Sequence, residues 1–231
     1  MMKIASLINT TESAVNSRQW NPYLGISINN KAFTPEYISG FMAWAAARSK
    51  DGVAVVVVDI IQRINNEVFN RSKPMAAIEK TFKKSGEILQ VCAAALSGLS
   101  AGEQERIVII EWPDVMQDET FRLNARVFSR AYEQNRSFKD FLIAITRRNL
   151  GEITSRLDEK QIEALSRYVL CELPEVFAGI HHKGIHYNLN VYPGKISSIY
   201  SELLQQEWFK PIYDQLRIAG KVALAEAYLQ E

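Results

Sequence analysis

The sequence predicts an α/β fold in which helices cover a mostly parallel sheet. Two runs rich in Val and Ile, 52–61 and 106–112, are apolar throughout instead of alternating, as expected of strands covered on both faces. Segments with helical patterns separate the candidate strands, an order typical of parallel strands connected by helices. The chain has no internal repeat and no Pro/Gly/Ser-rich linker, so residues 1–231 are predicted to form a single domain.

The predicted strands place two polar residues at one edge of the sheet. A short apolar run predicts the first strand at 21–28, and the alternating segment 185–193 predicts the last. Ligands of such sheets bind at the carboxyl ends of the strands. Ser27 and Asp59, at the ends of the first two strands, are therefore predicted to face one crevice. Asp59 either lines that crevice or caps the segment that follows it.

The predicted helices begin at residues that favour helix N-termini. The helix at 34–50 has Thr34 as its N-cap and Pro35 in its first turn. Pro74 begins a long helix at 74–96 in the same way. Further helical patterns cover 119–135, 137–150, 158–179 and the tail from 196.

Composition indicates a globular protein of a reducing compartment. The chain has 231 residues, is 47% hydrophobic and 23% charged, and carries a net charge of +1. It has two cysteines, Cys92 and Cys171, but no CxxC motif and no secretory leader, so a cytoplasmic location is predicted. The most apolar stretch, 53–61, is about half the ~20 residues that a membrane helix needs, so no membrane association is predicted. With so little net charge, the chain could bind nucleic acid only through a local basic face.

Motifs for the common nucleotide sites are missing. There is no G-x-x-x-x-G-K-[ST] and no G-x-G-x-x-G, so neither a P-loop nor a classical dinucleotide site is predicted. His181, His182 and His186 fall in one short segment without a cysteine or carboxylate motif, and a solvated loop is favoured over a metal site. No metal and no cofactor are predicted. A Ser-His-Asp triad stays open, and it requires one of these histidines to reach Ser27.

A tyrosine and a glutamate in the apolar sequence YVLCELP form a possible pair. Tyr168 and Glu172 are four residues apart, which places the phenol and the carboxylate on one face of a helix. Because burying a lone carboxylate is costly, Glu172 is expected either to be paired or to serve a ligand. On these residues alone, an ordinary surface pair is favoured over a ligand site. Tyr192, in NVYPG, carries little information by itself because tyrosine is common in strands.

Three short motifs, taken in order, resemble those of the tRNA-dependent cyclodipeptide synthases. They are Gly25-x-Ser27-x-x-Asn30, Tyr168-x-x-x-Glu172-Leu-Pro174 and Val-Tyr192-Pro193. Their order and spacing and the total length fit the family, so the resemblance covers nearly the whole chain. Pro193 corresponds to the subgroup that carries Tyr-Pro at this position. That subgroup is variable where this chain has Asn30, whose role therefore stays open.

The resemblance implies a Rossmann-like three-layer sandwich similar to the catalytic domains of class I tyrosyl- and tryptophanyl-tRNA synthetases. It implies that ATP binding has been lost, in agreement with the missing nucleotide motifs, and that no cofactor is used. The implied substrates are two aminoacyl-tRNAs, and the implied product is a 2,5-diketopiperazine. DNA is not an expected partner, and a monomer is expected.

The same resemblance implies roles for the motif residues. Ser27 attacks the ester of the first aminoacyl-tRNA and holds the amino acid as an acyl-enzyme. Tyr168 and Glu172 hold the α-ammonium group of that amino acid, and Tyr192 relays a proton during ring closure. Gly25 forms a wall where a side chain would block the first aminoacyl group, or else it allows a tight turn at the strand end.

A basic segment is the predicted contact with tRNA phosphates. Lys80, Lys83 and Lys84 are spaced i, i+3 and i+4, so they share one helix face, and Arg71 and Lys73 precede that helix. The basic helix of the family lies in a similar place. From composition alone, a solvated helix face accounts for these residues equally well.

Two other functions stay open at this level. A serine hydrolase or acyltransferase on the same α/β frame requires a histidine near Ser27 and predicts turnover of simple esters. A non-catalytic tRNA-binding module predicts tRNA binding without any product. Arg147 and Arg148 are a second candidate for tRNA contact.

Overall fold

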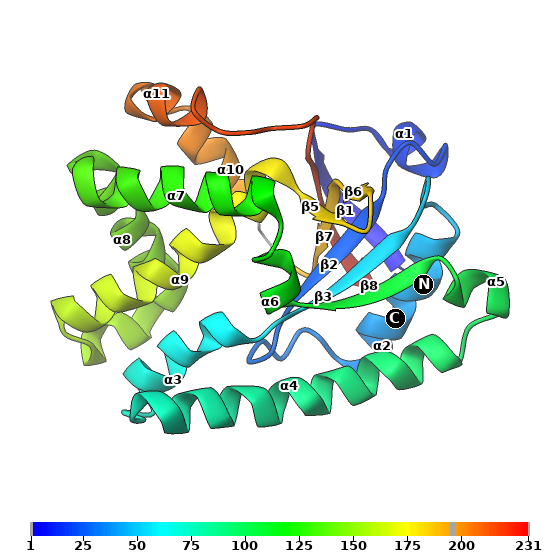
Figure 1. Ribbon diagram of the computed structural model, residues 1–231, viewed down its shortest axis with the longest axis horizontal. Helices are drawn as coiled ribbons and strands as arrows, with labels where there is room; N and C mark the ends of the chain where they lie inside the picture. The colour runs from blue at the N-terminus through cyan, green and yellow to red at the C-terminus, as the bar shows by residue number, and fades with distance from the viewer. Residues whose placement is uncertain (1, 195–196, 231) are drawn as a thin grey trace.

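The computed structural model describes residues 2–194 and 197–230. Within these residues the main sheet has six strands, in the spatial order β1-β8-β7-β2-β3-β4 (Figure 1). They are β1 (Met2–Ile8), β2 (Pro22–Ser27), β3 (Val53–Val58), β4 (Ile107–Glu111), β7 (Leu189–Tyr192) and β8 (Ala223–Leu229). A small hairpin is formed by β5 (Ile180–His182) and β6 (Ile185–Tyr187). In the main sheet β1 runs antiparallel to β8 and the other pairs are parallel, which confirms the predicted mostly parallel sheet.

The helices surround this sheet. The α-helices are α1 (Glu12–Asn16), α2 (Pro35–Ala46), α3 (Arg63–Phe69), α4 (Pro74–Ser97), α5 (Ala101–Gln104), α6 (Trp112–Val115), α7 (Glu119–Gln134), α8 (Arg136–Leu150), α9 (Glu159–Ala178), α10 (Ser197–Leu204) and α11 (Lys210–Tyr213). Short 3₁₀ helices are η1 (Ile60–Gln62), η2 (Gly151–Arg156) and η3 (Glu207–Phe209). Thr34 caps α2 as predicted, since its hydroxyl accepts from the Tyr37 amide at 3.2 Å. None of the described helices combines the length and the apolar character that crossing a membrane requires.

Helices cover both faces of the sheet, as the unbroken apolar runs predict. All of Val53–Val58 is buried. On one face Leu24 of β2 belongs to the same core as Phe41 of α2, and α4 runs below that face along the lower side of Figure 1. On the other face Tyr23 of β2 packs in a core with Trp112 of α6. The result is the predicted three-layer sandwich.

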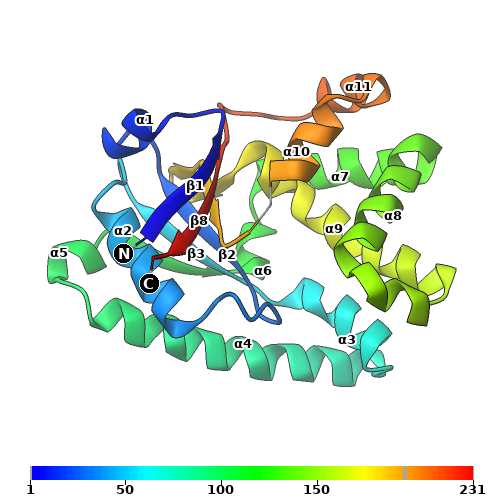
Figure 2. The same cartoon turned by 180° about the vertical axis from the view of Figure 1, so that it is seen from behind.

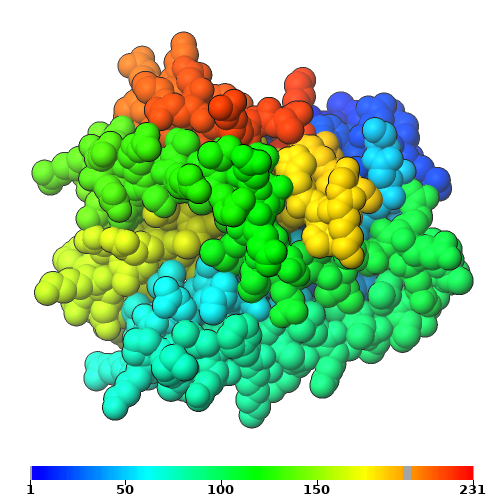
Figure 3. All heavy atoms as spheres, in the orientation of Figure 1, coloured from blue at the N-terminus to red at the C-terminus, as the bar shows by residue number. Residues whose placement is uncertain are grey.

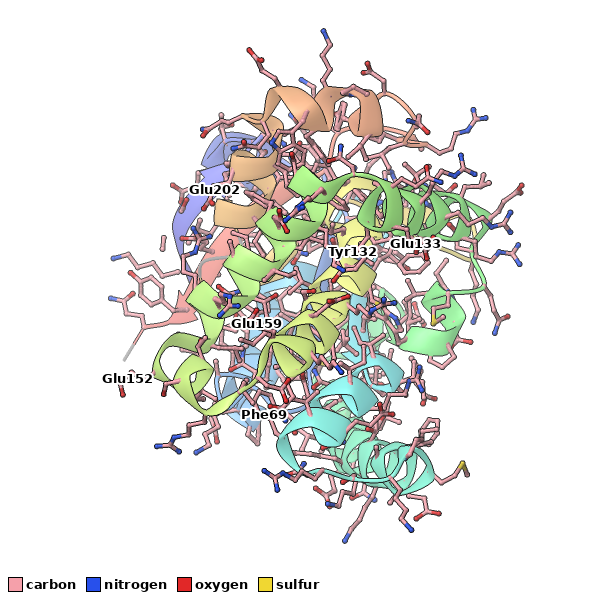
Figure 4. All side chains as sticks on the ribbon, turned by 90° about the vertical axis from the view of Figure 1, so that its left-hand side faces the viewer. Phe69, Tyr132, Glu133, Glu152, Glu159 and Glu202 are labelled. Carbon is pink, nitrogen blue, oxygen red and sulfur yellow. The ribbon has the colours of Figure 1, made fainter. Side chains whose placement is uncertain are left out.

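A second apolar core holds helices beyond the edge of the sandwich. It joins α7, α8 and α9 to α10, η3 and α11, and Figure 4 shows the first three helices side by side. Its buried phenylalanines are Phe128, Phe138, Phe177 and Phe209. This bundle fixes α9 beside the carboxyl end of β2, where Tyr168 meets Ser27.

The predicted helical tail is wrong in its last part. Residues 223–229 form β8, between β7 and β1, and β1 itself has no counterpart among the predicted strands. Figure 2 shows β1 and β8 side by side, with the two chain ends close together. The alanine-rich sequence of β8 favours a helix locally, but pairing with two neighbouring strands and burial on both faces select the extended form.

Two predicted strands also end differently from the prediction. The segment 185–193 forms two strands, because β6 belongs to the hairpin and β7 to the main sheet, with Asn188 between them. The strand predicted at 52–61 stops at Val58, where Asp59 caps η1. In both segments the apolar pattern continues across a change of backbone direction.

The strand order creates a switch point between β2 and β7. From β2 the sheet extends through β3 and β4 on one side and through β7 and β8 on the other. The register of β2 with β7 covers Pro22–Tyr23 and Leu189–Asn190, at the amino ends of the two strands. The carboxyl ends, with Ser27 and Tyr192, lie beyond that register. Open α/β sheets bind ligands at this kind of crevice.

Candidate active site

A cavity of about 140 Å³ lies at this switch point, between β2, β7 and α9. Its polar walls are Ser27, Asn149, Glu172, Glu175, Asn190 and Tyr192. The rest of the lining is Gly25, Val58, Val169, Leu173, Val176 and Ile199. Residues from the first and the last thirds of the chain therefore meet in one cavity.

Helix α9 presents three polar side chains toward β2. It begins at a capping box headed by Asp158 and ends at Gly179, whose φ of 69° suits glycine. A Cβ at Gly179 would also lie 2.4 Å from the Tyr187 carbonyl, which excludes any other residue there. Between these ends the polar side chains occupy positions i, i+4 and i+7 of one helix face. They are Tyr168, Glu172 and Glu175.

The Ser27 hydroxyl is held by a buried amide. Gln62 Nε2, in η1, lies 2.7 Å from Ser27 Oγ and 2.7 Å from Tyr168 Oη, and these two oxygens are 3.3 Å apart. The Gln62 oxygen accepts from Asn29 Nδ2 at 3.0 Å and from Asn65 Nδ2 at 2.7 Å. With its oxygen occupied by two donors, the Gln62 amide has to direct its NH₂ group at Ser27 and Tyr168.

These contacts set the direction of the hydrogen bonds from Ser27 to Glu172. Because Gln62 donates to both hydroxyl oxygens, the two hydroxyl protons must point elsewhere. Ser27 donates to Tyr168, and the Tyr168 phenol donates to the Glu172 carboxylate. One lone pair of Ser27 Oγ is therefore left for a group that enters the cavity.

The Glu172 carboxyl group has a pKa near neutral pH. Burial raises its pKa from 4.5 to about 7, and the hydrogen bond from Tyr168 offsets part of that rise. Burial and the neighbouring Glu172 raise the pKa of the Tyr168 phenol well above 10.0, so the phenol stays protonated and donates. The pair can bind an ammonium group by a charge-assisted hydrogen bond, which favours a ligand site over the surface pair.

Asn30 holds Tyr192 at the end of β7. Asn30 Nδ2 donates to Tyr192 Oη at 3.0 Å, and Asn30 Oδ1 accepts from the Ala32 amide at 3.0 Å. The Tyr192 ring also meets Phe33 edge to face, with ring centroids 5.5 Å apart. Since the phenolic oxygen accepts from Asn30, its proton is free to point toward a ligand. Asn30 thus orients the second tyrosine of the candidate site.

Gly25 lies inside β2, paired with Val56 of β3. Its alternative role in a tight turn at the strand end is therefore wrong. A Cβ at this position would lie 3.6 Å from Glu175 Oε1 and 3.7 Å from Val58 Cγ2, and it would fill the lining of the cavity. The role of Gly25 as a wall for an aminoacyl group stays a prediction.

Asp59 does not belong to the cavity, although it follows the neighbouring strand. It is fully buried, and its carboxylate accepts from the Ile60 amide at the start of η1. It is not among the residues that line the cavity around Ser27. The prediction that Asp59 and Ser27 face one crevice is wrong, and the capping role holds.

No histidine within residues 2–194 and 197–230 hydrogen-bonds Ser27. His181 and His186 stack in the β5–β6 hairpin, with ring centroids 4.2 Å apart, and His186 Nε2 lies 2.8 Å from the Ala178 oxygen. A Ser-His-Asp triad is therefore not formed. The described part of the chain also holds no group of three or more residues arranged to bind a metal ion.

The basic face of α4 is connected to Ser27 by hydrogen bonds. Lys80, Lys83 and Lys84 are exposed and line a groove that also includes Asn29. Lys84 Nζ donates to Asn29 Oδ1 at 2.8 Å, and Asn29 in turn hydrogen-bonds Gln62 beside Ser27. Figure 3 shows α3 and α4, in cyan and teal, forming the lower surface of the molecule. The predicted patch thus begins two hydrogen-bonding residues away from Ser27.

The other predicted basic residues fall into two groups. Arg71 and Lys73 are exposed in the turn between α3 and α4, and Arg71 has a left-handed φ of 48°. Arg147 and Arg148 of α8 instead form ion pairs. Arg147 pairs with Glu159, and Arg148 pairs with Glu202 at 2.9 Å, near the acidic residues labelled in Figure 4. These two arginines tie α8 to α9 and α10, which makes them poor candidates for tRNA contact.

Sequence reasoning missed five polar residues of this site. Gln62 hydrogen-bonds Ser27, and Asn29 hydrogen-bonds Gln62. Asn149, Glu175 and Asn190 line the cavity. The sequence contained a signal for Glu175, because this residue lies one helical turn after Glu172 on the face that Tyr168 and Glu172 share. The sequence contained no signal for Gln62, because this residue reaches Ser27 only after the chain turns back at Asp59.

The chain was compared with known families and solved structures. The family model described as cyclodipeptide synthase matches residues 9–209, which is most of the chain. The chain belongs to the cyclodipeptide synthase family. It is thus an enzyme of a tRNA-dependent aminoacyltransferase class. A comparison with curated protein sequences finds no match.

Solved cyclodipeptide synthases share the fold across nearly the whole chain. One from Bacillus thermoamylovorans superposes with a TM-score of 0.76 at 15% identity, covering 95% of this chain and 93% of the other. A Mycobacterium tuberculosis protein, described as relating these enzymes to type I tRNA synthetases, has a TM-score of 0.74 at 16% identity, with coverages of 97% and 93%. A synthase from Candidatus Glomeribacter gigasporarum, solved with Phe-tRNAPhe, has a TM-score of 0.62 at 16% identity, covering 95% of this chain and 92% of the other. The predicted likeness to class I synthetase domains is confirmed at the level of fold.

Proposed function

We propose that this cyclodipeptide synthase joins the aminoacyl groups of two aminoacyl-tRNAs into a 2,5-diketopiperazine through an ester on Ser27, without ATP. One observation carries the proposal. The Ser27 hydroxyl opens into a cavity, and hydrogen bonds from Gln62 and to Tyr168 hold it beside the Glu172 carboxyl. An aminoacyl-tRNA ester is already activated, so neither ATP nor a strong base is required.

In the first step Ser27 Oγ attacks the carbonyl carbon of the first aminoacyl-tRNA. The bond from Oγ to that carbon forms, and the bond from the carbon to the ribose oxygen of the tRNA breaks. The serine proton ends on the ribose oxygen that leaves. Ionised Glu172 and the Tyr168 hydroxyl hold the α-ammonium group, so the ester is presented to a fixed nucleophile.

In the second step the α-ammonium group of the seryl ester gives one proton to the Glu172 carboxylate, and the resulting amine attacks the carbonyl of the second aminoacyl-tRNA. The proton that this amine loses on attack ends on the ribose oxygen that leaves. A peptide bond forms, the second tRNA leaves, and a dipeptidyl-enzyme remains. The free amine of this dipeptide then attacks the ester on Ser27, which closes the six-membered ring and restores the serine hydroxyl. The closing step gains from proximity, because amine and ester belong to one short chain. Tyr192, whose proton is free, relays a proton in this step.

The tRNA is held by the basic face of α4. Lys80, Lys83, Lys84, Arg71 and Lys73 are exposed and supply the positive charge that phosphates require. Support comes from the synthase of Candidatus Glomeribacter gigasporarum, which was solved with Phe-tRNAPhe. We assign the chain to the Tyr-Pro subgroup on Tyr192 and Pro193.

Mass spectrometry tests the function directly. Medium from cells that express the protein is expected to contain cyclic dipeptides that disappear with Ser27→Ala, and the purified protein is expected to gain the mass of one aminoacyl group when mixed with aminoacyl-tRNA. Turnover of simple esters would support the hydrolase alternative. Binding of tRNA with no product and no acylation would support the non-catalytic module.

A further inference from the structure

Two buried polar groups in the cavity wall have no partner. Glu175 is 5% exposed and Asn190 is 1% exposed, and both line the cavity next to Ser27. Within the described residues, Glu175 Oε2 and Asn190 Oδ1 make no hydrogen bond. A polar atom left unpaired at such a depth destabilises the empty protein. Two such unpaired atoms in one cavity wall indicate a ligand that supplies their hydrogen-bond partners.

The Asn190 side chain is fixed so that its free atom is an acceptor. The Tyr23 phenol donates to the main-chain oxygen of Glu175 at 3.2 Å, and the Asn190 side chain hydrogen-bonds the same phenol. Because the Tyr23 proton is used, the Asn190 amide nitrogen is the donor in that contact, and its oxygen is left free. The missing partner of Asn190 is therefore a hydrogen-bond donor, and the ionised form of Glu175, which can only accept, requires a donor as well.

The described residues that line the cavity carry no positive charge. Among these described lining residues are two carboxyl groups, Glu172 and Glu175, and no Lys, Arg or His. No ion pair within the described residues includes Glu175. Glu172 is assigned to the α-ammonium group of the substrate, which leaves Glu175 without a cationic partner. Gly25 keeps the approach to it open, because a Cβ there would lie 3.6 Å from Glu175 Oε1.

The remaining walls suit an aliphatic chain. Val169, Leu173 and Val176 of α9 face the cavity together with Val58 and Ile199. A side chain that combines several methylene groups with a cationic head matches both features, because its stem contacts the apolar wall and its head reaches the two acceptors. Lysine and arginine have this build, whereas leucine and phenylalanine leave both acceptors unpaired.

We propose that this cavity receives the side chain of the first aminoacyl group and selects a long cationic one, arginine or lysine, through Glu175 and Asn190. The inference rests on the proposed function, since it concerns the aminoacyl group that acylates Ser27. A site built to hydrogen-bond its substrate rejects an analogue without the donor far more strongly than a purely apolar pocket discriminates by size.

The test compares acylation of Ser27 by a panel of aminoacyl-tRNAs with one tRNA body. The tRNA is charged in turn with arginine, lysine, norleucine, leucine, phenylalanine and glutamate, and the rate of acyl-enzyme formation is followed by intact-protein mass. Norleucine is the matched control, since it keeps a straight aliphatic stem and lacks the ammonium group. Lysine or arginine is expected to react at least about tenfold faster than norleucine.

Variants then assign the preference to Glu175. Glu175→Leu is expected to reverse the order of lysine and norleucine, and the near-isosteric Glu175→Gln to reduce the preference for lysine while keeping the shape of the wall. Val176→Leu, in the same lining, alters volume without altering charge and is expected to keep the order. Thermal unfolding will reveal whether Glu175→Leu folds. If it does not, the preference of Glu175→Gln for lysine over norleucine still tests the role of Glu175.

The outcomes separate this inference from the proposed function. Acylation by norleucine, leucine, phenylalanine or glutamate as fast as by lysine and arginine would overturn the inference and leave the seryl intermediate standing. Absence of acylation by every member of the panel would overturn the proposed function, and the inference with it.

Discussion

Glu172 links the candidate site to pH. Its pKa of about 7 means that lowering the pH through 7 protonates the carboxylate that is assigned to the α-ammonium group. We therefore expect kcat/KM for aminoacyl-tRNA to fall about tenfold for each pH unit below 7. The measurement is initial product formation between pH 5.5 and 8 at subsaturating substrate.

The variant Glu172→Gln provides the control for this pH profile. It keeps the shape of the side chain and cannot ionise, so the acidic limb should disappear. The loss of a charge-assisted hydrogen bond should lower activity at pH 8 by roughly 10- to 100-fold. A variant that retains the wild-type acidic limb would assign the titration to another group.

Gln62 holds the Ser27 hydroxyl, because its amide nitrogen lies 2.7 Å from both Ser27 Oγ and Tyr168 Oη. Removing the amide in Gln62→Ala frees the Ser27 hydroxyl to rotate, and misplacing a reacting atom by about 1 Å can cost roughly 100-fold. We expect Ser27 acylation to slow by about 10- to 100-fold with little change in KM. Single-turnover acylation followed by mass spectrometry measures it.

A matched variant distinguishes positioning from general destabilisation. Asn65→Ala removes one of the two donors on the Gln62 oxygen and leaves the contacts with Ser27 and Tyr168 in place. It should slow acylation much less than Gln62→Ala does. Equal losses in the two variants, or a loss that follows the melting temperature alone, would argue against a positioning role.

At the scale of elements, α4 is predicted to carry tRNA affinity. Replacing Lys80, Lys83 and Lys84 by alanine should weaken binding most at low salt. The slope of log K against log salt is negative, and each lost phosphate contact should reduce its magnitude by about 0.7–0.9. Binding of one aminoacyl-tRNA at several salt concentrations gives that slope.

The control for α4 uses three lysines that are equally exposed on other surfaces. Lys3, Lys160 and Lys210 lie on β1, α9 and α11. Their replacement by alanine lowers the net charge by the same amount and should leave the slope nearly unchanged. Equal effects of the two triple variants would mean that overall charge, and not α4, governs binding.

Elements with a strong local pattern were the predictable part of the fold. The helices with recognisable starts, such as α2 at Thr34 and α4 at Pro74, begin where their N-terminal residues indicate. The strand β8 was not predictable, because its alanine-rich sequence is compatible with a helix and only its neighbours in the sheet select extension.

For the whole molecule, the buried carboxyls predict that stability falls as pH rises. In the folded protein the pKa of Glu172 is about 7, against 4.5 for an ordinary glutamate, so between these values the folded state binds more protons than the unfolded state. The free energy of unfolding should thus decrease by up to about 3 kcal/mol on account of this group as pH rises from 4.5 to above 7. Denaturant unfolding at pH 5 and pH 8 measures the change.

The double variant Glu172→Gln, Glu175→Gln isolates these carboxyls from all others. Burial also raises the pKa of Glu175, so both groups oppose folding once they ionise. The variant should gain stability relative to the wild type at pH 8 and little at pH 5. A difference between the two proteins that is the same at both pH values would contradict the buried-carboxyl explanation.

The sequence by itself determined which chemical groups are available and how they are spaced along each element. Tyr168 and Glu172 share a face because the helix repeat requires it, and two apolar runs predict strands covered on both sides. The tertiary structure alone decided which groups meet. It brought Gln62 to Ser27, left Asp59 as a cap, and turned Glu175 and Asn190 into unpaired acceptors in one wall. The physical reason is that helical and strand periodicity act over a few neighbouring residues, whereas contacts between distant segments depend on how the completed elements pack.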